Sequence, residues 1–158
     1  MGMEKKSGRR MGFVIAGMLL FLAAPVVLLK VTMREEQAAF GTSGCFREEE
    51  VKARAEEIVR LFCAGSYGTL LEEYGAEGTV REQNIRAMEN SAAGIGADWG
   101  ACREITWQAL WEVKLLGGNY ATVQAEAACE NVTVVFRISF NEKMEMSGIE
   151  VEASAVAG

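Results

Sequence analysis

The sequence of 158 residues contains no histidine, and this absence excludes several kinds of functional site. Serine–histidine–aspartate triads, histidine-ligated metals and the most common general base all need an imidazole. Asp98 is the only aspartate, and it lies in a glycine-rich loop at residues 93–101, where a role in the turn is the simpler interpretation. We therefore expect no catalytic residue, no metal site and no cofactor.

Sequence motifs of nucleotide and zinc sites are missing as well. The glycine-rich loop contains neither GxGxxG nor GK[ST], so it is not a phosphate-binding loop. None of the four cysteines stands in a CxxC pair: Cys45, Cys63, Cys102 and Cys129. Oxidation would permit three full disulfide pairings, whereas the simpler interpretation is that most of them are small buried apolar side chains. The sequence does not select a pairing.

Charge is distributed unevenly along the chain. Residues 1–10 contain four basic residues and one acidic residue, whereas the part from Phe46 onward contains 10 basic and 19 acidic residues. An acidic domain repels a phosphate backbone, so we expect no nucleic-acid partner. The apolar share of 50% and the single proline are typical of a folded chain and not of a disordered one.

An uncharged run of 19 residues extends from Met11 to Leu29, between two arginines and Lys30. At about 1.5 Å per residue, a helix of this length crosses the hydrocarbon core of a bilayer, which is roughly 30 Å thick. The basic residues before the run place the amino terminus in the cytoplasm by the positive-inside rule. We expect a single-pass transmembrane anchor at residues 11–29 and an extracytoplasmic domain on the cell membrane.

Two other interpretations of this amino-terminal segment fit the sequence less well than the anchor. A cleaved signal peptide has a hydrophobic region of at most about 15 residues followed by a small-x-small site, but residues 30–37 are mostly polar. A lipoprotein would use Cys45 after Thr42-Ser43-Gly44, but this cysteine lies well past the apolar run and lacks the usual leucine three positions before it. The uncleaved anchor fits the sequence best.

Three helices are expected after a polar linker at residues 30–45. Residues 46–64 carry an apolar stripe at helical spacing: Val51, Ala55, Ile58 and Phe62. Two further helices are indicated by capping boxes, because Thr69 and Thr79 each precede a glutamate by three residues. The third helix is expected to end near Gly94, where the glycine-rich loop begins.

Alternation with a period of two indicates four antiparallel strands in the rest of the domain. The expected strands are residues 103–115, 120–130, 132–140 and a last one from Met144 to Val151. The last strand changes phase at Ser147-Gly148, where we predict a β-bulge. Residues 154–158 are expected to form a frayed tail, so the folded domain covers residues 46–153.

The first of these strands carries an apolar face with two tryptophans, and this face determines the expected register. The face consists of Ile105, Trp107, Ala109, Trp111 and Val113. A three-residue turn pairs Leu115 with Asn119 and aligns this face with that of the second strand, whereas a two-residue turn at Gly117-Gly118 does not. We predict the three-residue turn, with the apolar face directed inward and no carboxylate on it.

The order of elements and the apolar spacing resemble those of a known group of domains. The residues that carry the resemblance are Ile58-Val59-Arg60-Leu61-Phe62, Gly65-Ser66-Tyr67 before Leu70-Leu71, and the hairpin at residues 120–140 with Val132-Thr133-Val134-Val135-Phe136. They are similar to small bacterial exported domains of unknown function with the nuclear-transport-factor-like, or cystatin-like, fold. The resemblance implies an α+β domain with about three helices on a curved, cone-like, four-stranded antiparallel sheet. It supplies no catalytic residues.

The sequence favours a non-catalytic, membrane-tethered binding or interaction module of the bacterial cell envelope. Aromatic side chains would line a pocket for a hydrophobic small ligand or a protein partner: Tyr67, Tyr74, Trp99, Trp107, Trp111 and Phe136. The two strand tryptophans are more simply core residues. The alternative function is a small-molecule enzyme of the isomerase or hydrolase type that uses the cone of this fold. A homodimer through the polar sheet face that carries Gln108 and Gln124 is a third interpretation.

Overall fold

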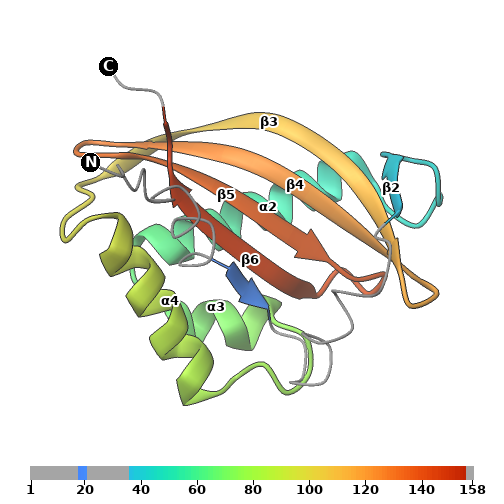
Figure 1. Cartoon of the computed structure of the whole chain (residues 1–158), viewed down its shortest axis with the longest axis horizontal. Coiled ribbons are helices and arrows are strands. Elements are labelled where there is room, and N and C mark those ends of the chain that lie inside the picture. Colours follow the sequence, from blue (N-terminus) through green and yellow to red (C-terminus); the bar gives the residue numbers. More distant parts are fainter. Residues whose placement is uncertain (1–17, 21–35, 156–158) are drawn as a thin grey trace, which may run out of the picture.

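The computed structural model describes residues 18–20 and 36–155 of the chain. Three helices pack with an open antiparallel sheet of five strands in an α+β fold (Figure 1). The helices are α2 (Glu48–Cys63), α3 (Tyr67–Tyr74) and α4 (Glu82–Ile95). The strands are β2 (Glu36–Ala39), β3 (Cys102–Leu115), β4 (Gly118–Cys129), β5 (Thr133–Phe140) and β6 (Met146–Ala153). The α+β class and the three helices are confirmed, and the sheet has more strands than the four predicted.

The five strands follow the order β6-β5-β4-β3-β2, and each neighbouring pair is antiparallel. A three-residue strand, β1 (Met18–Leu20), lies against the other side of β6. The strand β2 belongs to the predicted linker and pairs with residues 111–114 at the edge of β3. An edge strand that is open to solvent needs no apolar face, so its sequence EQAA carries no strand pattern.

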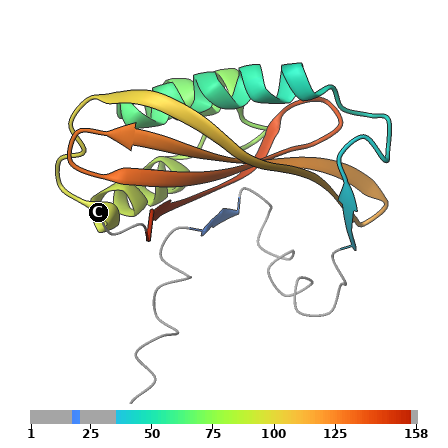
Figure 2. The same ribbon diagram turned by 90° about the horizontal axis from the view of Figure 1, so that it is seen from above.

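Helix α2 lies along one face of the sheet and supplies the centre of the core (Figure 2). The predicted stripe is confirmed, because its four residues are at most 1% exposed: Val51, Ala55, Ile58 and Phe62. The inward side chains of β4 and β5 are fully buried: Ala121, Val123, Ala125, Ala127, Val134, Phe136, Ile138 and Phe140. Small side chains on β4 let the helix approach the sheet, and larger ones on β5 fill the remaining volume.

Both predicted capping boxes are wrong. Helix α3 begins at Tyr67, so Thr69 lies inside the helix and not at its start. Helix α4 begins at Glu82, and the Thr79 hydroxyl donates to the Ala76 carbonyl oxygen at 2.6 Å instead of accepting from a helix N–H. Thr79 is 2% exposed, so this hydrogen bond satisfies a buried hydroxyl within the turn that joins the two helices.

The turn between β3 and β4 has two residues, so the predicted three-residue turn is wrong. Leu115 pairs with Gly118 across it. Leu116 (φ 54°) and Gly117 (φ 79°) both have positive φ, as in a type I′ turn. Leucine rarely adopts this left-handed backbone conformation, so the sequence alone favours a turn that has glycine at its centre.

A β-bulge at Gln108 divides the apolar face that the sequence predicts for β3. Before the bulge, Trp107 lies opposite the buried Ala125 and faces the core. After the bulge, Leu110 lies opposite the buried Val123, so the inward phase has moved by one residue. The predicted inward orientation is therefore wrong for the last three residues of that face, Ala109, Trp111 and Val113.

The β-bulge predicted in β6 is confirmed. Ser139 pairs with Gly148 but the next residue of β5 pairs with Met146, which leaves Ser147 as the extra residue. The Ser147 hydroxyl donates to the Ser139 carbonyl oxygen at 3.1 Å. Because of the bulge, Met146 and Ile149 both face the core, at 0% and 1% exposure.

The predicted transmembrane anchor at residues 11–29 lies outside the described residues, apart from the three residues of β1. The predicted basic tail at residues 1–10 lies outside them as well. None of the helices in the described part of the chain is long and apolar enough to cross a membrane. At the other end, Ser154 donates to the Thr133 carbonyl oxygen at 2.8 Å, so the predicted fraying does not begin at this residue.

Candidate functional site

A hollow of about 440 Å³ opens where the ends of the helices meet the loop that leads into β3. The end of α2, the start of α3, the second half of α4 and residues 96–100 all line it. Its larger lining side chains are Phe62, Cys63, Tyr67, Glu89, Asp98 and Trp99. The volume is in the range of sites for small organic ligands. The structure thus brings two predicted ligand-binding residues, Tyr67 and Trp99, into one site.

The turn between α2 and α3 presents Tyr67 to this hollow. Gly65 (φ 72°) ends α2 in the left-handed conformation, and its N–H donates to the Phe62 carbonyl oxygen at 3.0 Å. The Ser66 N–H donates to the Leu61 carbonyl oxygen at 2.9 Å, which completes a Schellman motif. Because α3 begins at the next residue, the Tyr67 ring lies edge-on to Phe62, with ring centroids 5.0 Å apart.

Phe62 is the centre of an aromatic cluster that forms the inner wall of the hollow. Trp99 stacks on Phe62 with centroids 5.9 Å apart, and Phe136 of β5 meets Phe62 edge-on at 5.4 Å. The Trp99 indole N–H donates to the Ala92 carbonyl oxygen of α4 at 3.3 Å. Phe62 and Phe136 are buried, whereas Tyr67 and Trp99 are half-buried and expose part of their apolar surface.

The loop at residues 96–100 is fastened to the turn between β4 and β5. The Asn131 N–H donates to the Trp99 carbonyl oxygen at 3.0 Å, and its side chain donates to the Asp98 carbonyl oxygen at 3.3 Å. Position 100 requires glycine (φ 68°), since a Cβ there would lie 2.6 Å from the Glu130 Cβ. The Asp98 carboxylate accepts the Gly100 N–H at 2.9 Å, which confirms the turn role predicted for it.

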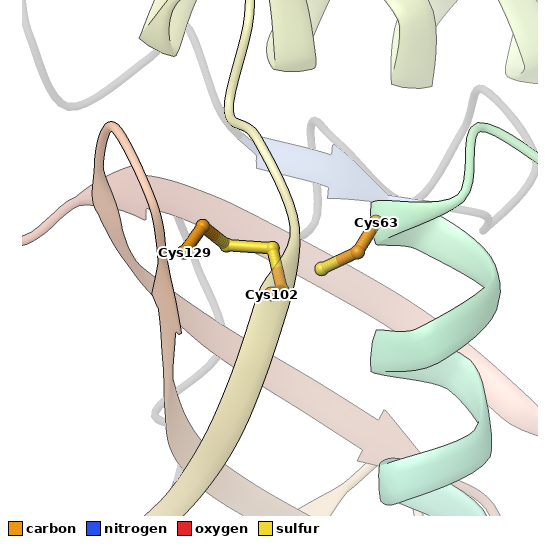
Figure 3. A group of neighbouring side chains, drawn as sticks. All are labelled: Cys63, Cys102 and Cys129. Carbon is orange, nitrogen blue, oxygen red and sulfur yellow. A yellow bond between two sulfur atoms is a disulfide. The ribbon is translucent and has the colours of Figure 1, made fainter.

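Three cysteines lie together beside the hollow (Figure 3). Cys102 at the start of β3 and Cys129 at the end of β4 are cross-strand partners and form a disulfide. The Cys63 side chain points toward this disulfide from the end of α2, and the three sulfurs lie within 4.8 Å of one another. Cys63 and the exposed Cys45 are free thiols. The simpler interpretation, that most cysteines are buried apolar side chains, is therefore wrong.

Burial and acidic groups determine the electrostatics of the hollow. Burial raises the pKa of the Cys63 thiol to about 11, so this thiol is protonated at neutral pH. Burial also raises the pKa of the Tyr67 hydroxyl, with smaller contributions from Glu89 and Cys63. Among the described residues that line the hollow, Glu89 and Asp98 are the only charged side chains. The lining therefore disfavours an anion and is compatible with a neutral or cationic ligand.

The other predicted ligand-binding residues do not line this hollow. Phe136 is fully buried and contacts the aromatic cluster from the sheet side. Tyr74 at the end of α3 and Trp107 on β3 are half-buried and pack against the core. Trp111 lies opposite Thr122, on the face of β3 that turns away from the core after the bulge.

Sequence reasoning missed two residues of the site, Phe62 and Cys63. The apolar stripe of α2 identifies Phe62 as a core residue but not its aromatic neighbours. Cys63 follows it directly, and it approaches a disulfide whose cysteines lie far along the chain. The local sequence shows only that Cys63 lies at the end of an amphipathic helix, next to the Gly65-Ser66-Tyr67 turn. It does not show which residues Cys63 contacts.

A buried carboxylate lies at the other end of β3. Glu112 is opposite the inward-facing Ala121 and is 3% exposed, so the prediction that no carboxylate points inward is wrong. Its two oxygens accept the N–H groups of Gly41 and Ser43, each at 2.8 Å. Burial alone would raise the pKa of Glu112, but hydrogen bonds from Ser43 and Gly41 outweigh burial and lower it. This carboxylate is ionised and occupied, which makes it a structural group.

The outer face of the sheet carries a connected set of polar side chains. Gln108 donates to Glu126 at 2.9 Å and accepts from Gln124 at 2.7 Å. Arg137 donates to Gln124 at 3.0 Å and forms ion pairs with two glutamates of β6. The polar face that the sequence offers for a homodimer is therefore hydrogen-bonded within the chain, and the homodimer stays a prediction.

The chemistry available at the hollow consists of ligand binding and reactions of sulfur. While Cys102 and Cys129 are joined, neither has a thiolate to donate to a metal ion, so the three sulfurs do not form a metal site in this state. No family model, no curated protein and no solved structure matches the chain. The function of the protein is therefore inferred from the site itself.

Proposed function

We propose that this protein is a non-catalytic binding module, tethered to the cell membrane and facing outward, whose hollow binds a small apolar or aromatic ligand. The observation that carries the proposal is the convergence of Phe62, Tyr67 and Trp99 on one hollow of about 440 Å³. Half-buried aromatic rings provide a large apolar contact area with little conformational freedom to lose on binding.

The charges of the hollow favour a ligand with an amine over one with a carboxylate. Glu89 and Asp98 are acidic, and no basic side chain is found among the described residues that line the hollow. A cationic group is attracted by these carboxylates and by aromatic faces such as that of Trp99, whereas an anion is repelled by the carboxylates. A phenylalkyl amine is therefore the simplest probe of the site.

Two independent features support the extracytoplasmic location. The first is the uncharged run from Met11 to Leu29 with basic residues before it. The second is the disulfide between Cys102 and Cys129, since disulfides persist mainly outside the cytoplasm. The proposed membrane helix at residues 11–29 includes the three residues of β1, which pairs with β6. If these residues form the membrane helix, they do not pair with β6, and β6 becomes the free edge of the sheet.

We also infer that the fold is a variant of the nuclear-transport-factor-like, or cystatin-like, cone. The element order supports this, because three helices precede the β3–β6 meander and α2 lies across the sheet. The β-bulges at Gln108 and Ser147 also support it, because a bulge bends its strand and so helps to curve the sheet. The edge strand β2 is an addition to the four strands that the resemblance implies.

The enzyme alternative has less support at this site. Tyr67 has a raised pKa, so its hydroxyl stays protonated and is a hydrogen-bond donor, not a general base. The lining contains two carboxylates, and because Asp98 accepts the Gly100 N–H, Glu89 is the remaining candidate base. The alternative would replace our proposal if the full-length protein hydrolysed or isomerised a small ester or ketone and Glu89→Gln abolished that turnover.

A fluorescence titration tests the proposed function. The chain has three tryptophans, so a Trp107→Phe, Trp111→Phe variant of the full-length protein in detergent leaves Trp99 as the only indole. We expect 4-phenylbutylamine to change the Trp99 emission in a saturable way. The acid of the same length, 4-phenylbutyrate, should bind at least about tenfold more weakly because of the two carboxylates.

Matched variants locate the binding. Tyr67→Ala removes a ring from the hollow and should weaken amine binding at least about fivefold. Val80→Ala, on a side chain that is 50% exposed and outside the hollow, should leave it unchanged. The proposal is wrong if neither probe gives a saturable signal, or if Tyr67→Ala binds the amine as the parent variant does.

A further inference from the structure

We propose that Cys63, Cys102 and Cys129 form a thiol–disulfide exchange site, through which the crosslink moves from the sheet to the wall of the hollow. A free thiol and a disulfide lie within 4.8 Å of each other, and they belong to three different elements of the fold. The distance needs only a small movement to become a sulfur–sulfur contact. This juxtaposition is independent of the ligand proposed above and stands without it.

The geometry selects the sulfur that is attacked. Figure 3 shows the Cys63 side chain directed at the Cys102 side of the disulfide, with Cys129 on the far side. Thiol–disulfide exchange requires a thiolate to approach one sulfur while the other sulfur departs. Cys102 is therefore the sulfur attacked and Cys129 is the leaving group.

The reaction is balanced without any outside oxidant or reductant. The Cys63 thiol first loses its proton to solvent, and the thiolate then forms a bond to the Cys102 sulfur. The Cys102–Cys129 bond breaks at the same time, its electron pair remains on the Cys129 sulfur, and that thiolate takes up a proton. One disulfide and one thiol are present before and after the step, so there is no net oxidation.

The exchange changes which parts of the fold are tied together. The present disulfide joins β3 to β4 within one sheet, whereas a Cys63–Cys102 disulfide joins α2 to β3 across two layers. Cys63 lines the hollow, so the new crosslink would form part of its wall. The released Cys129 lies two residues before Asn131, which holds the Trp99 loop, and the loop would lose a covalent support nearby.

The surroundings make this exchange slow at neutral pH. The titratable groups that line the hollow with Cys63 are Tyr67 on α3, Glu89 on α4 and Asp98 in the loop, and none is a cation at neutral pH. On the sheet side, Arg103 and Glu130 flank the disulfide and pair with each other at 2.8 Å. With no unpaired cation to stabilise a thiolate among these groups, the step accelerates only as the pH rises.

Alkylation mapping tests the proposal on the full-length chain. Cys45→Ser removes the other free thiol and serves as the parent variant. A low concentration of iodoacetamide then labels whichever of the remaining cysteines is free, and the labelled residue is identified by mass spectrometry of non-reduced peptides. We expect label on Cys129, together with a Cys63–Cys102 disulfide, in an amount that increases with pH.

A matched variant distinguishes exchange from simple opening of the disulfide. In Cys45→Ser, Cys63→Ser the attacking thiol is gone, so Cys129 should remain unlabelled at every pH. Label on Cys63 alone in the parent, from neutral to alkaline pH, would overturn the proposal. Equal labelling of Cys129 with and without Cys63 would overturn it as well.

A second measurement remains decisive if the rearranged form is a minor species. In Cys45→Ser, Cys129→Ser, oxidised glutathione should convert Cys63 and Cys102 to an internal disulfide. In Cys45→Ser, Cys102→Ser, the Cys63–Cys129 disulfide should form at least about tenfold more slowly, since the Cys63 side chain faces Cys102. Accumulation of glutathione adducts with no internal disulfide in either variant would contradict the proposed geometry.

Discussion

The two ends of the β3–β4 hairpin are fastened by different chemistry. At the open end, a disulfide joins Cys102 to Cys129, and the free thiol of Cys63 lies beside it. Near the turn, the ionised Glu112 accepts the N–H groups of the loop that follows β2. Both fastenings are partly or fully buried, but the disulfide joins two strands of one sheet, whereas Glu112 joins β3 to the loop after β2. Only the disulfide has the free thiol of Cys63 beside it.

The carboxylate of Glu112 and the thiol of Cys63 differ in what they can still do. Both oxygens of Glu112 accept backbone N–H groups, and these hydrogen bonds lower its pKa, so the ionised carboxylate stabilises the fold. Cys63 is a free thiol that lines the hollow, and its sulfur lies close to a disulfide with which it can react. We therefore propose that the cysteine end is the functional end of the domain and that the Glu112 end is structural.

The largest expected effect is at the cysteine end, from Phe62→Ala. Phe62 is 1% exposed and contacts three other aromatic rings. Its truncation should reduce the free energy of unfolding by about 3–5 kcal/mol through lost burial and a residual cavity. Urea unfolding of the full-length protein, followed by circular dichroism, measures this. The exposed control Val80→Ala should change stability by less than about 0.5 kcal/mol, and an equal loss in both variants would contradict the account.

Loss of the disulfide should have the next largest effect. The double substitution Cys102→Ser, Cys129→Ser opens a crosslink with a sequence separation of 27 residues. The free energy of unfolding should fall by about 2–4 kcal/mol, because the unfolded chain regains the entropy that the crosslink removed. Cys45→Ser is the matched control for a cysteine outside any disulfide. Equal stability of the double variant and this control would show that the crosslink does not support the domain.

At the structural end, Glu112→Gln should destabilise the protein by about 1–3 kcal/mol at neutral pH. The folded-state pKa of Glu112 is lowered, so its contribution is present above the unfolded-state pKa and is lost as the pH falls through the folded-state pKa. The stability gap between wild type and variant should therefore narrow in acid. Parallel pH titrations of stability measure the gap, with the exposed Glu82→Gln as control. A gap that widens in acid would contradict the assignment.

The smallest expected effect is in the turn beyond Glu112. Leu116 is 57% exposed and has φ 54°, a region that asparagine adopts more readily than leucine. Leu116→Asn should stabilise the protein by about 0.5–1 kcal/mol by relieving this strain. Thermal unfolding of wild type and variant, recorded side by side, measures the difference. Destabilisation by this substitution would show that the turn is not of the type I′ form.

The sequence predicts the local structure around Phe62 correctly, but it does not predict the inward orientation of Glu112. The helical stripe around Phe62 and the period of two in β4 and β5 depend on local spacing, and both appear in the structure. The bulge at Gln108 is invisible locally, because the apolar alternation continues without a break from Ile105 to Val113. Only pairing with β4 shows that one residue is inserted and that Glu112 faces inward.

The candidate site was predictable in part for the same reason. Tyr67 and Trp99 are aromatic residues next to turns, which marks them as candidates for a pocket without showing that they meet. Cysteine counting permits three full pairings and contains no distances. The approach of Cys63 to the disulfide depends on how α2 lies across the sheet, and this is a tertiary property that sequence spacing does not encode.

Hydrogen exchange of the full-length protein, with and without saturating 4-phenylbutylamine, shows which end of the hairpin responds to a ligand. We expect slower amide exchange in the segments 62–67 and 92–100, which contain most of the residues that line the hollow. Exchange should be unchanged at residues 36–43, beside Glu112. Protection at residues 36–43, or no protection at the hollow, would contradict the assignment of the cysteine end as the functional end.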